Sequence, residues 1–284
     1  MTSIALERHP VAPPEPVAAD RPPRLAWRAP AASIGWGLLG AAVTIALWQL
    51  VAMRAPALPT PAEGFGELAR LLRSPFANHG PNDKGVGLQL VTSLGRVLSG
   101  FGLAAAVGIP VGLAIGASRR AWQAVNPVVQ ILRPVSPLAW FPIWLMVWKD
   151  AGHASISVIL ITALWPIVIN TAAGAAAVPR DHRNVAKVFR FDRRTYLRHV
   201  LLPNALPSIV TGLRLSMGVA WMVIVAVEML SGGSGIGFFV WDSYNASNLA
   251  AVVAAIVLIG GVGVVLDFAF LRLAKRVAIE EVVA

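Results

Sequence analysis

Five charged residues lie inside stretches that are otherwise long and apolar enough to cross a membrane: Arg96, Arg133, Arg214, Glu228 and Asp267. A charge at the centre of a bilayer costs roughly 2.5–3.5 kcal/mol on insertion scales, so such groups usually pair or face a water-filled route. By depth along the chain, Arg96 and Glu228 fall toward the outer side, and Arg214 and Asp267 toward the inner side. We therefore predict the ion pairs Arg96–Glu228 and Arg214–Asp267, which would hold the helices together.

Arg133 has no evident partner of opposite charge. Either its side chain extends to the cytoplasmic face, or it helps to attract an anion. It lies in an apolar stretch interrupted by four prolines, Pro127, Pro134, Pro137 and Pro142. Each proline removes an amide donor and clashes with the preceding turn, so this stretch is predicted to be a broken or kinked helix.

Broken helices recur at the substrate sites of transporters, which makes this stretch a candidate translocation path. We assign to the path Arg133, Trp140, Trp144 and Glu228. Two simpler interpretations stay open. The kink can serve packing alone, and the aromatic residues can form an interfacial belt.

Residues for other kinds of chemistry are missing from the sequence or wrongly spaced. There is no Cys, and the five His are scattered without a metal-binding spacing, so no metal site is predicted. The sequence has neither a nucleophile–base pair nor an HExxH motif, so it gives no indication of an enzyme. A GxGxxG match at residues 35–40 has no preceding strand, and LSGGS at 230–234 lacks an accompanying GxxxxGK[ST] phosphate loop. We predict that this chain binds no nucleotide or cofactor, and that 230–234 is a flexible turn.

The composition is that of a membrane protein. Of 284 residues, 56% are hydrophobic and 13% are charged, with a mean hydropathy of +0.67, whereas soluble domains carry about 25% charged residues. The net charge of +10 does not indicate nucleic-acid binding, because the basic residues fall in short blocks between apolar runs and form no basic face.

Six membrane spans are predicted, at about 33–53, 88–117, 121–148, 153–177, 205–230 and 249–271. Residues 1–32, rich in Pro and Arg, are predicted to be a disordered cytoplasmic tail. Residues 33–87 would hold the first span and an external connection, 88–276 the core, and 277–284 a C-terminal tail. A Gly-rich loop is expected at 231–248. With both termini cytoplasmic, most Lys and Arg lie inside, as the positive-inside rule requires.

The longest basic block, residues 179–203, lies between two apolar runs and resembles the EAA loop of permease subunits of ABC importers, E-A-A-x3-G-x9-I-x-L-P. Ala186, Leu202 and Pro203 match this pattern and Val200 is a conservative change, whereas Asn184, Val185 and Arg190 depart from it. Further stretches, among them SLGRVLSGFGLA at 93–104 and VEMLSGGSGIGFFVWDSYN at 227–245, resemble the nitrate/sulfonate/taurine branch over about 88–276. Within that branch the chain looks most like nitrate permeases.

The resemblance implies an all-α, type I ABC importer permease of the inner (plasma) membrane that imports a small anion, most of all nitrate (or nitrite or cyanate). It also implies a second permease copy, two cytoplasmic ATPase subunits that bind ATP and Mg, and a periplasmic or lipid-anchored binding protein. The ATPases would contact a coupling loop that includes Arg183, Asn184, Val185, Ala186, Lys187, Val188, Phe189, Arg190 and Pro203. Alternatives are a sulfonate or taurine importer of the same branch, and a secondary transporter driven by an ion gradient.

The residues of the loop agree with a coupling role. Asp192 can accept from the free amides of a second short helix, which predicts two helices with a break near 190–192. Val185, Val188 and Phe189 would form an apolar face on the first helix that can dock into a groove. Arg190 replaces the Gly that supplies a permissive turn in the family. The alternative is a basic loop that lies on anionic lipid.

Overall fold

The computed structural model describes residues 30–55, 57–78, 80 and 84–283, with side chains described for 35–273 outside these gaps. Most of the predicted N-terminal tail, residues 1–29, lies outside this range. The described residues contain helices and no strand, only one isolated bridge between Asn78 and Lys84, so the prediction of an all-α fold is confirmed. The chain divides into two compact units, residues 1–50 and 51–284.

The first unit contributes one described helix, α1 (Pro30–Arg54), whose last turn extends past the boundary. Its apolar part, Gly35–Arg54, is long enough to cross a membrane, in agreement with the predicted first span at 33–53. The GxGxxG match at 35–40 lies inside this helix. It therefore does not form the strand–turn–helix that binds a dinucleotide.

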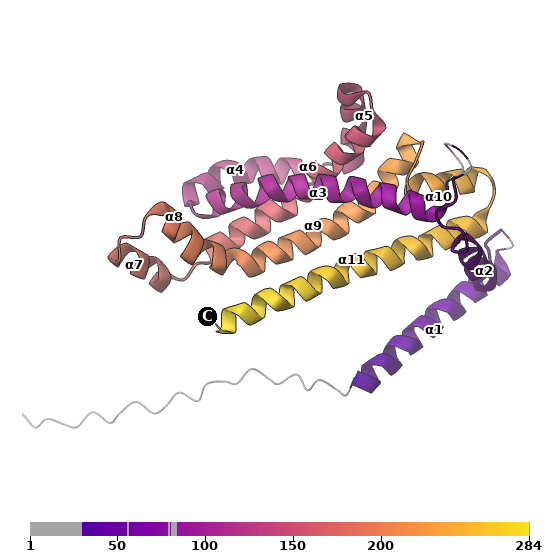
Figure 1. Cartoon of the computed structure of the whole chain (residues 1–284), viewed down its shortest axis with the longest axis horizontal. Helices are drawn as coiled ribbons and strands as arrows, with labels where there is room; N and C mark the ends of the chain where they lie inside the picture. Colours follow the sequence, from indigo (N-terminus) through magenta and orange to yellow (C-terminus); the bar gives the residue numbers. More distant parts are fainter. Residues whose placement is uncertain (1–29, 56, 79, 81–83, 284) are drawn as a thin grey trace, which may run out of the picture. The chain divides into compact units, whose positions relative to one another are not determined.

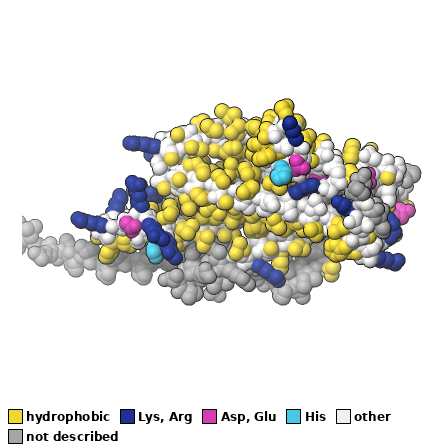
Figure 2. All heavy atoms as spheres, turned by 45° about the horizontal axis from the view of Figure 1, so that its top comes forward, with side chains coloured by type: hydrophobic (Ala, Val, Ile, Leu, Met, Phe, Trp, Pro, Cys, Tyr) yellow, Lys and Arg dark blue, Asp and Glu magenta, His cyan; other side chains and the backbone are white. Residues whose placement is uncertain are grey.

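Four long helices organise the second unit: α3 (Val86–Gly116), α6 (Ala151–Ala176), α9 (Leu202–Ser231) and α11 (Leu249–Val283). In Figure 1 the short helices α7 (Arg180–Val188) and α8 (Arg193–Tyr196) lie at one end of this group, and α2 (Pro61–Leu71) and α10 (Ile236–Asn245) lie at the other. Hydrophobic side chains cover much of the middle of the face in Figure 2, and Lys and Arg gather at the end that carries α7 and α8. This distribution is that of a membrane-spanning bundle.

The predicted third span is broken. Its two halves are α4 (Arg119–Leu132) and α5 (Pro137–Trp148), which meet at an angle of 91°. The described residues therefore give five candidate spans, or six if this bent pair counts as one. The break follows from the prolines, since Pro134 cannot donate a backbone hydrogen bond and Pro137 begins a new helix.

Small residues let α3 and α6 approach closely. Gly100, Ala104, Gly108 and Gly112 recur every four residues on one face of α3, and all are buried. A Cβ atom on Gly112 would lie 2.6 Å from the Cβ of Thr171 on α6. Such a row of small residues is the usual basis of close helix packing in membranes, where van der Waals contact replaces the hydrophobic effect.

The Gly-rich stretch at 231–248 is not a loop throughout, although a loop was predicted there. Its second half forms helix α10, and its first half makes specific contacts described below. The last helix contains a candidate span at Leu249–Leu273, in agreement with the predicted sixth span, and α11 continues through the predicted tail to Val283.

Candidate coupling segment and translocation path

The candidate coupling segment contains α7, a break and α8, which are the two helices and the break that the sequence predicted. At the end of α7 the Phe191 amide donates to the Ala186 carbonyl (2.9 Å), and the Arg190 amide donates to the Lys187 carbonyl (3.1 Å). This pair of bonds is a Schellman motif, which requires a left-handed residue after the helix. Arg190 takes that conformation, with φ 49°. The arginine therefore makes the turn that glycine makes in the family pattern.

Asp192 caps the start of α8. Its carboxylate accepts from the Thr195 amide at 3.3 Å. Hydrogen bonds from Thr195 lower the pKa of Asp192 below its ordinary value. Two short helices with a defined turn between them result, so the segment has a fixed shape.

A wide turn and a proline connect this segment to α9. Leu197–Leu201 form a π-helical turn, in which the Leu202 amide donates to the Leu197 carbonyl. Pro203 follows directly after this turn, within a helical run that continues from Arg193 to Ser231, and it has no N–H to donate to the preceding turn. The Asn204 side chain donates to the Val200 carbonyl at 2.6 Å. π-Turns often occur at functional sites.

The segment exposes an apolar face surrounded by charge. The exposed fractions are 50% for Val185, 78% for Val188 and 70% for Phe189. The Phe189 ring lies 6.4 Å from that of Phe191. Ala186 instead is buried, in a cluster with Val178 and Val200. The other predicted coupling residues that are exposed are Arg183, Asn184, Lys187, Arg190 and Pro203.

Arg183 faces back toward the bundle and joins α7 to the end of α6. Its guanidinium donates to the Val178 carbonyl (2.7 and 3.1 Å) and to the Ala176 carbonyl (3.2 Å). The last carbonyls of a helix lack partners within it, and a cation there also interacts favourably with the helix dipole. Arg183 therefore fixes α7 to α6.

Arg96 and Glu228 are brought together at the α10 end of the bundle, with 2.8 Å between Arg96 Nη1 and Glu228 Oε1. The Glu228 side chain is completely buried and also accepts from Ser93 Oγ (2.7 Å) and the Gly237 amide (3.1 Å). Arg96 donates in addition to the carbonyl (2.7 Å) and the hydroxyl (3.0 Å) of Ser234.

The same cluster closes the N-terminus of α10. The Gly235 amide donates to Gln89 Oε1 (2.6 Å), and the Ile236 amide donates to Ser93 Oγ (2.8 Å). A side chain at Gly235, where φ is 114°, would collide with the Glu228 carboxylate. These contacts, which the sequence did not predict, fix the Gly-rich turn to α3 and α9.

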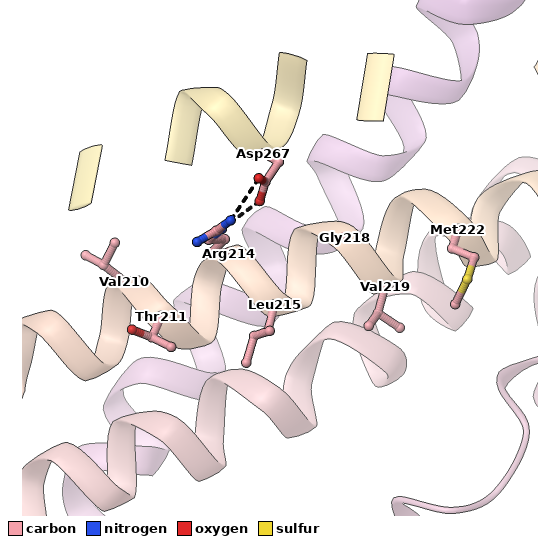
Figure 3. A pocket seen from close by; sticks show the side chains of 8 residues that line it. All are labelled: Val210, Thr211, Arg214, Leu215, Gly218, Val219, Met222 and Asp267. Atoms are coloured by element: carbon pink, nitrogen blue, oxygen red, sulfur yellow. Dashed lines mark hydrogen bonds and ion pairs between the residues drawn. The ribbon is translucent and has the colours of Figure 1, made fainter. Parts of the chain in front are cut away.

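Arg214 and Asp267 form the second pair, a bidentate one between α9 and α11. Arg214 Nε lies 2.6 Å from Asp267 Oδ1, and Arg214 Nη2 lies 2.8 Å from Oδ2. Both side chains are partly exposed, at 39% and 48%. Figure 3 shows them at a cavity of about 620 Å³ along α9, whose other lining residues are Val210, Thr211, Leu215, Gly218, Val219 and Met222.

Arg133 and Trp140, two of the four predicted path residues, line a second cavity of about 280 Å³ at the bend between α4 and α5. The other walls come mainly from α6 and α9, and they include Thr162, Trp165, Pro166 and Val219. Trp144 lies instead in an apolar cluster with Phe141 and Val158. Glu228 belongs to the buried network with Arg96 and does not line this cavity.

Comparisons with known proteins agree on one family. The family model described as "binding-protein-dependent transport system inner membrane component" matches residues 108–279. A nitrate import permease protein of Synechocystis is 45% identical over 80% of this chain and 82% of its own length. A bicarbonate transport system permease protein of Synechococcus elongatus is 42% identical over 85% of this chain and 88% of its own.

A putative aliphatic sulfonates transport permease protein of Bacillus subtilis is 34% identical over 85% of this chain and 86% of its own length. Among solved structures, the inward-facing MetNI methionine ABC transporter superposes with a TM-score of 0.60 at 18% identity, over 66% of this chain and 93% of the other, a likeness of fold alone. In these systems ATP is hydrolysed by separate subunits. The chain belongs to the family of binding-protein-dependent transport system inner membrane components, and it is a multi-pass plasma-membrane permease subunit of an ABC importer.

Proposed function

We propose that this chain is the permease of an ATP-driven importer of nitrate. The observation that carries the proposal is the similarity to nitrate import permease proteins from three cyanobacterial sources, at 42–45% identity over 79–84% of this chain. Nitrate, nitrite and cyanate share the chemistry of a small, singly charged anion. The bicarbonate relatives, at 41–42% identity, make bicarbonate the main competing substrate, and a sulfonate or taurine is the more distant one.

The coupling segment supports the ATP-driven mechanism. Val185, Val188 and Phe189 present an exposed apolar face on one short helix, the kind of surface that docks into a groove of a partner. We assign that groove to a cytoplasmic ATPase subunit, which binds ATP and Mg. This assignment places the coupling segment and both termini in the cytoplasm, in agreement with the positive-inside rule.

A second copy of the permease is the partner proposed for the exposed side of α9. The stripe Thr211, Leu215, Gly218 and Met222 is exposed along a helix whose other faces are buried. Next to it lies the Arg214–Asp267 pair, whose charges would be costly to expose to lipid. Two copies facing each other there would enclose a route, which a binding protein supplies from outside. ATP-driven closure of the two ATPases would then rock the copies between outward and inward access.

Reconstitution tests the function directly. The permease, its ATPase subunits and its binding protein would be reconstituted in liposomes with the ATPase subunits facing the lumen, and uptake of ¹⁵N-nitrate would be measured with and without ATP inside the liposomes. We expect nitrate uptake that requires ATP and binding protein and is not inhibited by excess bicarbonate. Uptake of bicarbonate instead of nitrate would show that the substrate assignment is wrong. Uptake without ATP that collapses with an ionophore would favour the secondary transporter.

Charge substitutions test the coupling segment. Val185→Asp and Val188→Asp are expected to abolish ATP-driven uptake and the stimulation of ATP hydrolysis by loaded binding protein, because a carboxylate cannot enter an apolar groove without cost. Arg194→Asp, at an exposed position of α8 outside the assigned coupling residues, is the control. Unchanged uptake with both valine substitutions would contradict the docking role.

A further inference from the structure

Of the three arginines inside the apolar stretches, Arg133 alone lacks a protein counter-charge among the residues that the structure describes. Arg96 pairs with Glu228 and Arg214 pairs with Asp267. The Arg133 side chain has no hydrogen bond or ion pair within the described part of the chain. A cation at membrane depth is costly without an anion or water beside it. The Arg133 guanidinium therefore requires an anion or water beside it.

The cavity beside Arg133 is at the middle of the bundle. Val219, one of its walls, lies 17 residues after the first residue of α9 and 12 before the last, which places it roughly 18 Å from the nearer end. Thr162 and Pro166 lie similarly near the middle of α6 (Ala151–Ala176). Arg133 therefore cannot place its charge at either end of the helices, as the alternative of extension to the cytoplasmic face requires.

The cavity has the size and lining of a small-anion site. Its volume is about 280 Å³, while one water molecule occupies about 30 Å³ of liquid, so an anion with part of its hydration shell fits. The walls are mostly apolar, and the side chains of Trp140, Thr162 and Trp165 are among them. Apolar walls with a few placed polar groups are typical of ligand sites.

The broken helix adds a favourable field at the same place. Pro137, the first residue of α5, lines the cavity. Ser136 at the N-cap makes no side-chain bond to the α5 backbone, so the positive end of that helix is not neutralised by a cap. Half-helices whose N-termini face an anionic substrate at the midplane are a recurring arrangement in transporters.

We propose that this cavity, with Arg133 as its charged group, holds the transported anion midway across the membrane. The proposal rests on the anion-import function proposed above. A planar guanidinium donates two parallel bonds to two oxygens of a planar anion, which suits nitrate and bicarbonate. The exposure of Arg133 keeps the site weak, as transport requires, since an anion that binds too tightly is not released.

The cavity also lies beside the hollow at Arg214 and Asp267. Val219 is a wall of both cavities. In the proposed route, an anion released from Arg133 moves along α9 past Val219 to the Arg214–Asp267 pair, whose two charges already balance each other. This arrangement gives Arg133 and Arg214 different roles, with one binding the anion and the other joining α9 to α11.

Transport by the full complex in liposomes is the first test. Arg133→Gln is expected to lower nitrate uptake per ATP hydrolysed by roughly tenfold or more, the effect of losing a hydrogen bond to a charged group. Arg133→Lys, which keeps the charge but not the bidentate geometry, should be intermediate. Arg120→Gln, which removes an exposed arginine of the same helix, should equal wild type. Equal uptake by Arg133→Gln and Arg120→Gln would overturn the proposal.

Anion binding is the second test, and it does not depend on turnover. Iodide quenching of tryptophan fluorescence would be compared with quenching by neutral acrylamide. We expect an iodide component that nitrate suppresses, that Trp140→Phe removes, and that Arg133→Gln weakens while acrylamide quenching stays constant. If Arg133→Gln does not assemble, the wild-type complex alone decides the question. The absence of nitrate-suppressible iodide quenching in the wild type would overturn the proposal.

The two proposals fail in different ways. Wild-type complexes that import bicarbonate and not nitrate would show that the substrate of the proposed function is wrong. The site is then tested with bicarbonate as the competing anion, and a suppressible iodide component that depends on Arg133 would still support it.

Discussion

Replacing Arg96 by glutamine is expected to destabilise the permease by about 3–5 kcal/mol, the usual cost of removing one partner from a buried ion pair. The cost follows from Glu228, whose side chain is 0% exposed. Its two neutral donors, Ser93 Oγ at 2.7 Å and the Gly237 amide at 3.1 Å, would remain. Neither carries a charge to balance the carboxylate.

Glu228→Gln should cost less, about 1.5–3 kcal/mol, which is the range for a hydrogen bond to a charged group. Arg96 would keep its bonds to the carbonyl and hydroxyl of Ser234, and its side chain is 16% exposed. In the double variant no charge is left unbalanced. Its cost should fall short of the sum of the single costs by about 0.5–3 kcal/mol, the range measured for residues in direct contact.

Thermal unfolding in detergent, followed by tryptophan fluorescence, measures these differences, and about 3–5 kcal/mol corresponds to a shift of roughly ten degrees in a chain of this size. Arg120→Gln, an exposed arginine in α4, is the control for loss of charge. Additive effects in the double variant would show that Arg96 and Glu228 do not stabilise each other. An Arg96→Gln midpoint equal to that of the control would show that the carboxylate does not need the arginine.

Three further outcomes are expected. Gly112→Val should prevent stable packing of α3 on α6, whereas Gly102→Val, on an open face of the same helix where a Cβ meets nothing within 4 Å, should be tolerated; size-exclusion chromatography distinguishes them, and equal profiles would refute the close contact. Arg190→Gly should remove a left-handed strain of about 1 kcal/mol and slow amide exchange in the coupling segment, and Arg190→Val should speed it; the opposite order would contradict the observed turn. The pKa of Asp192 is lowered in the folded protein. Asp192 therefore stabilises α8 at pH values above its ordinary pKa of 3.8, and it loses this effect as the pH falls through the lowered pKa. Amide exchange of the segment should therefore accelerate in acid in the wild type but show no such acid-dependent step in Asp192→Asn.

The sequence predicted those features that depend on neighbouring residues or on the depth of a residue in the membrane. Apolar length predicted the spans, and prolines predicted the break in the third one. Charge and depth alone indicated which arginine would meet which acidic residue, because a buried charge in lipid has few alternatives. The cap by Asp192 and the break before it were also readable, since an N-cap depends on residues three positions apart.

The turn before α10 could not be read from the sequence, because its partners are distant. A run such as Ser-Gly-Gly-Ser-Gly is typical of a flexible loop by local rules. Here its amides bind side chains of α3, and Gly235 and Gln89 are 146 residues apart. Glycine serves in this turn to bring the backbone close to Glu228, and no local pattern distinguishes that use from flexibility.

The position of Arg183 connects the coupling segment to the cavity at Arg133. Its guanidinium binds the carbonyl of Ala176, the last residue of α6, and that of Val178 just beyond it, and α6 in turn supplies Thr162 and Pro166 to the cavity wall. Because α3 packs on α6 through glycines with no room for adjustment, a displacement of α7 would move α6 as a rigid body. The wall at Thr162 would then move relative to Arg133, which lies in the break where α4 and α5 meet at 91°. A motion at the coupling segment therefore changes the cavity without passing through a flexible element, which is the property that an ATP-driven gate requires.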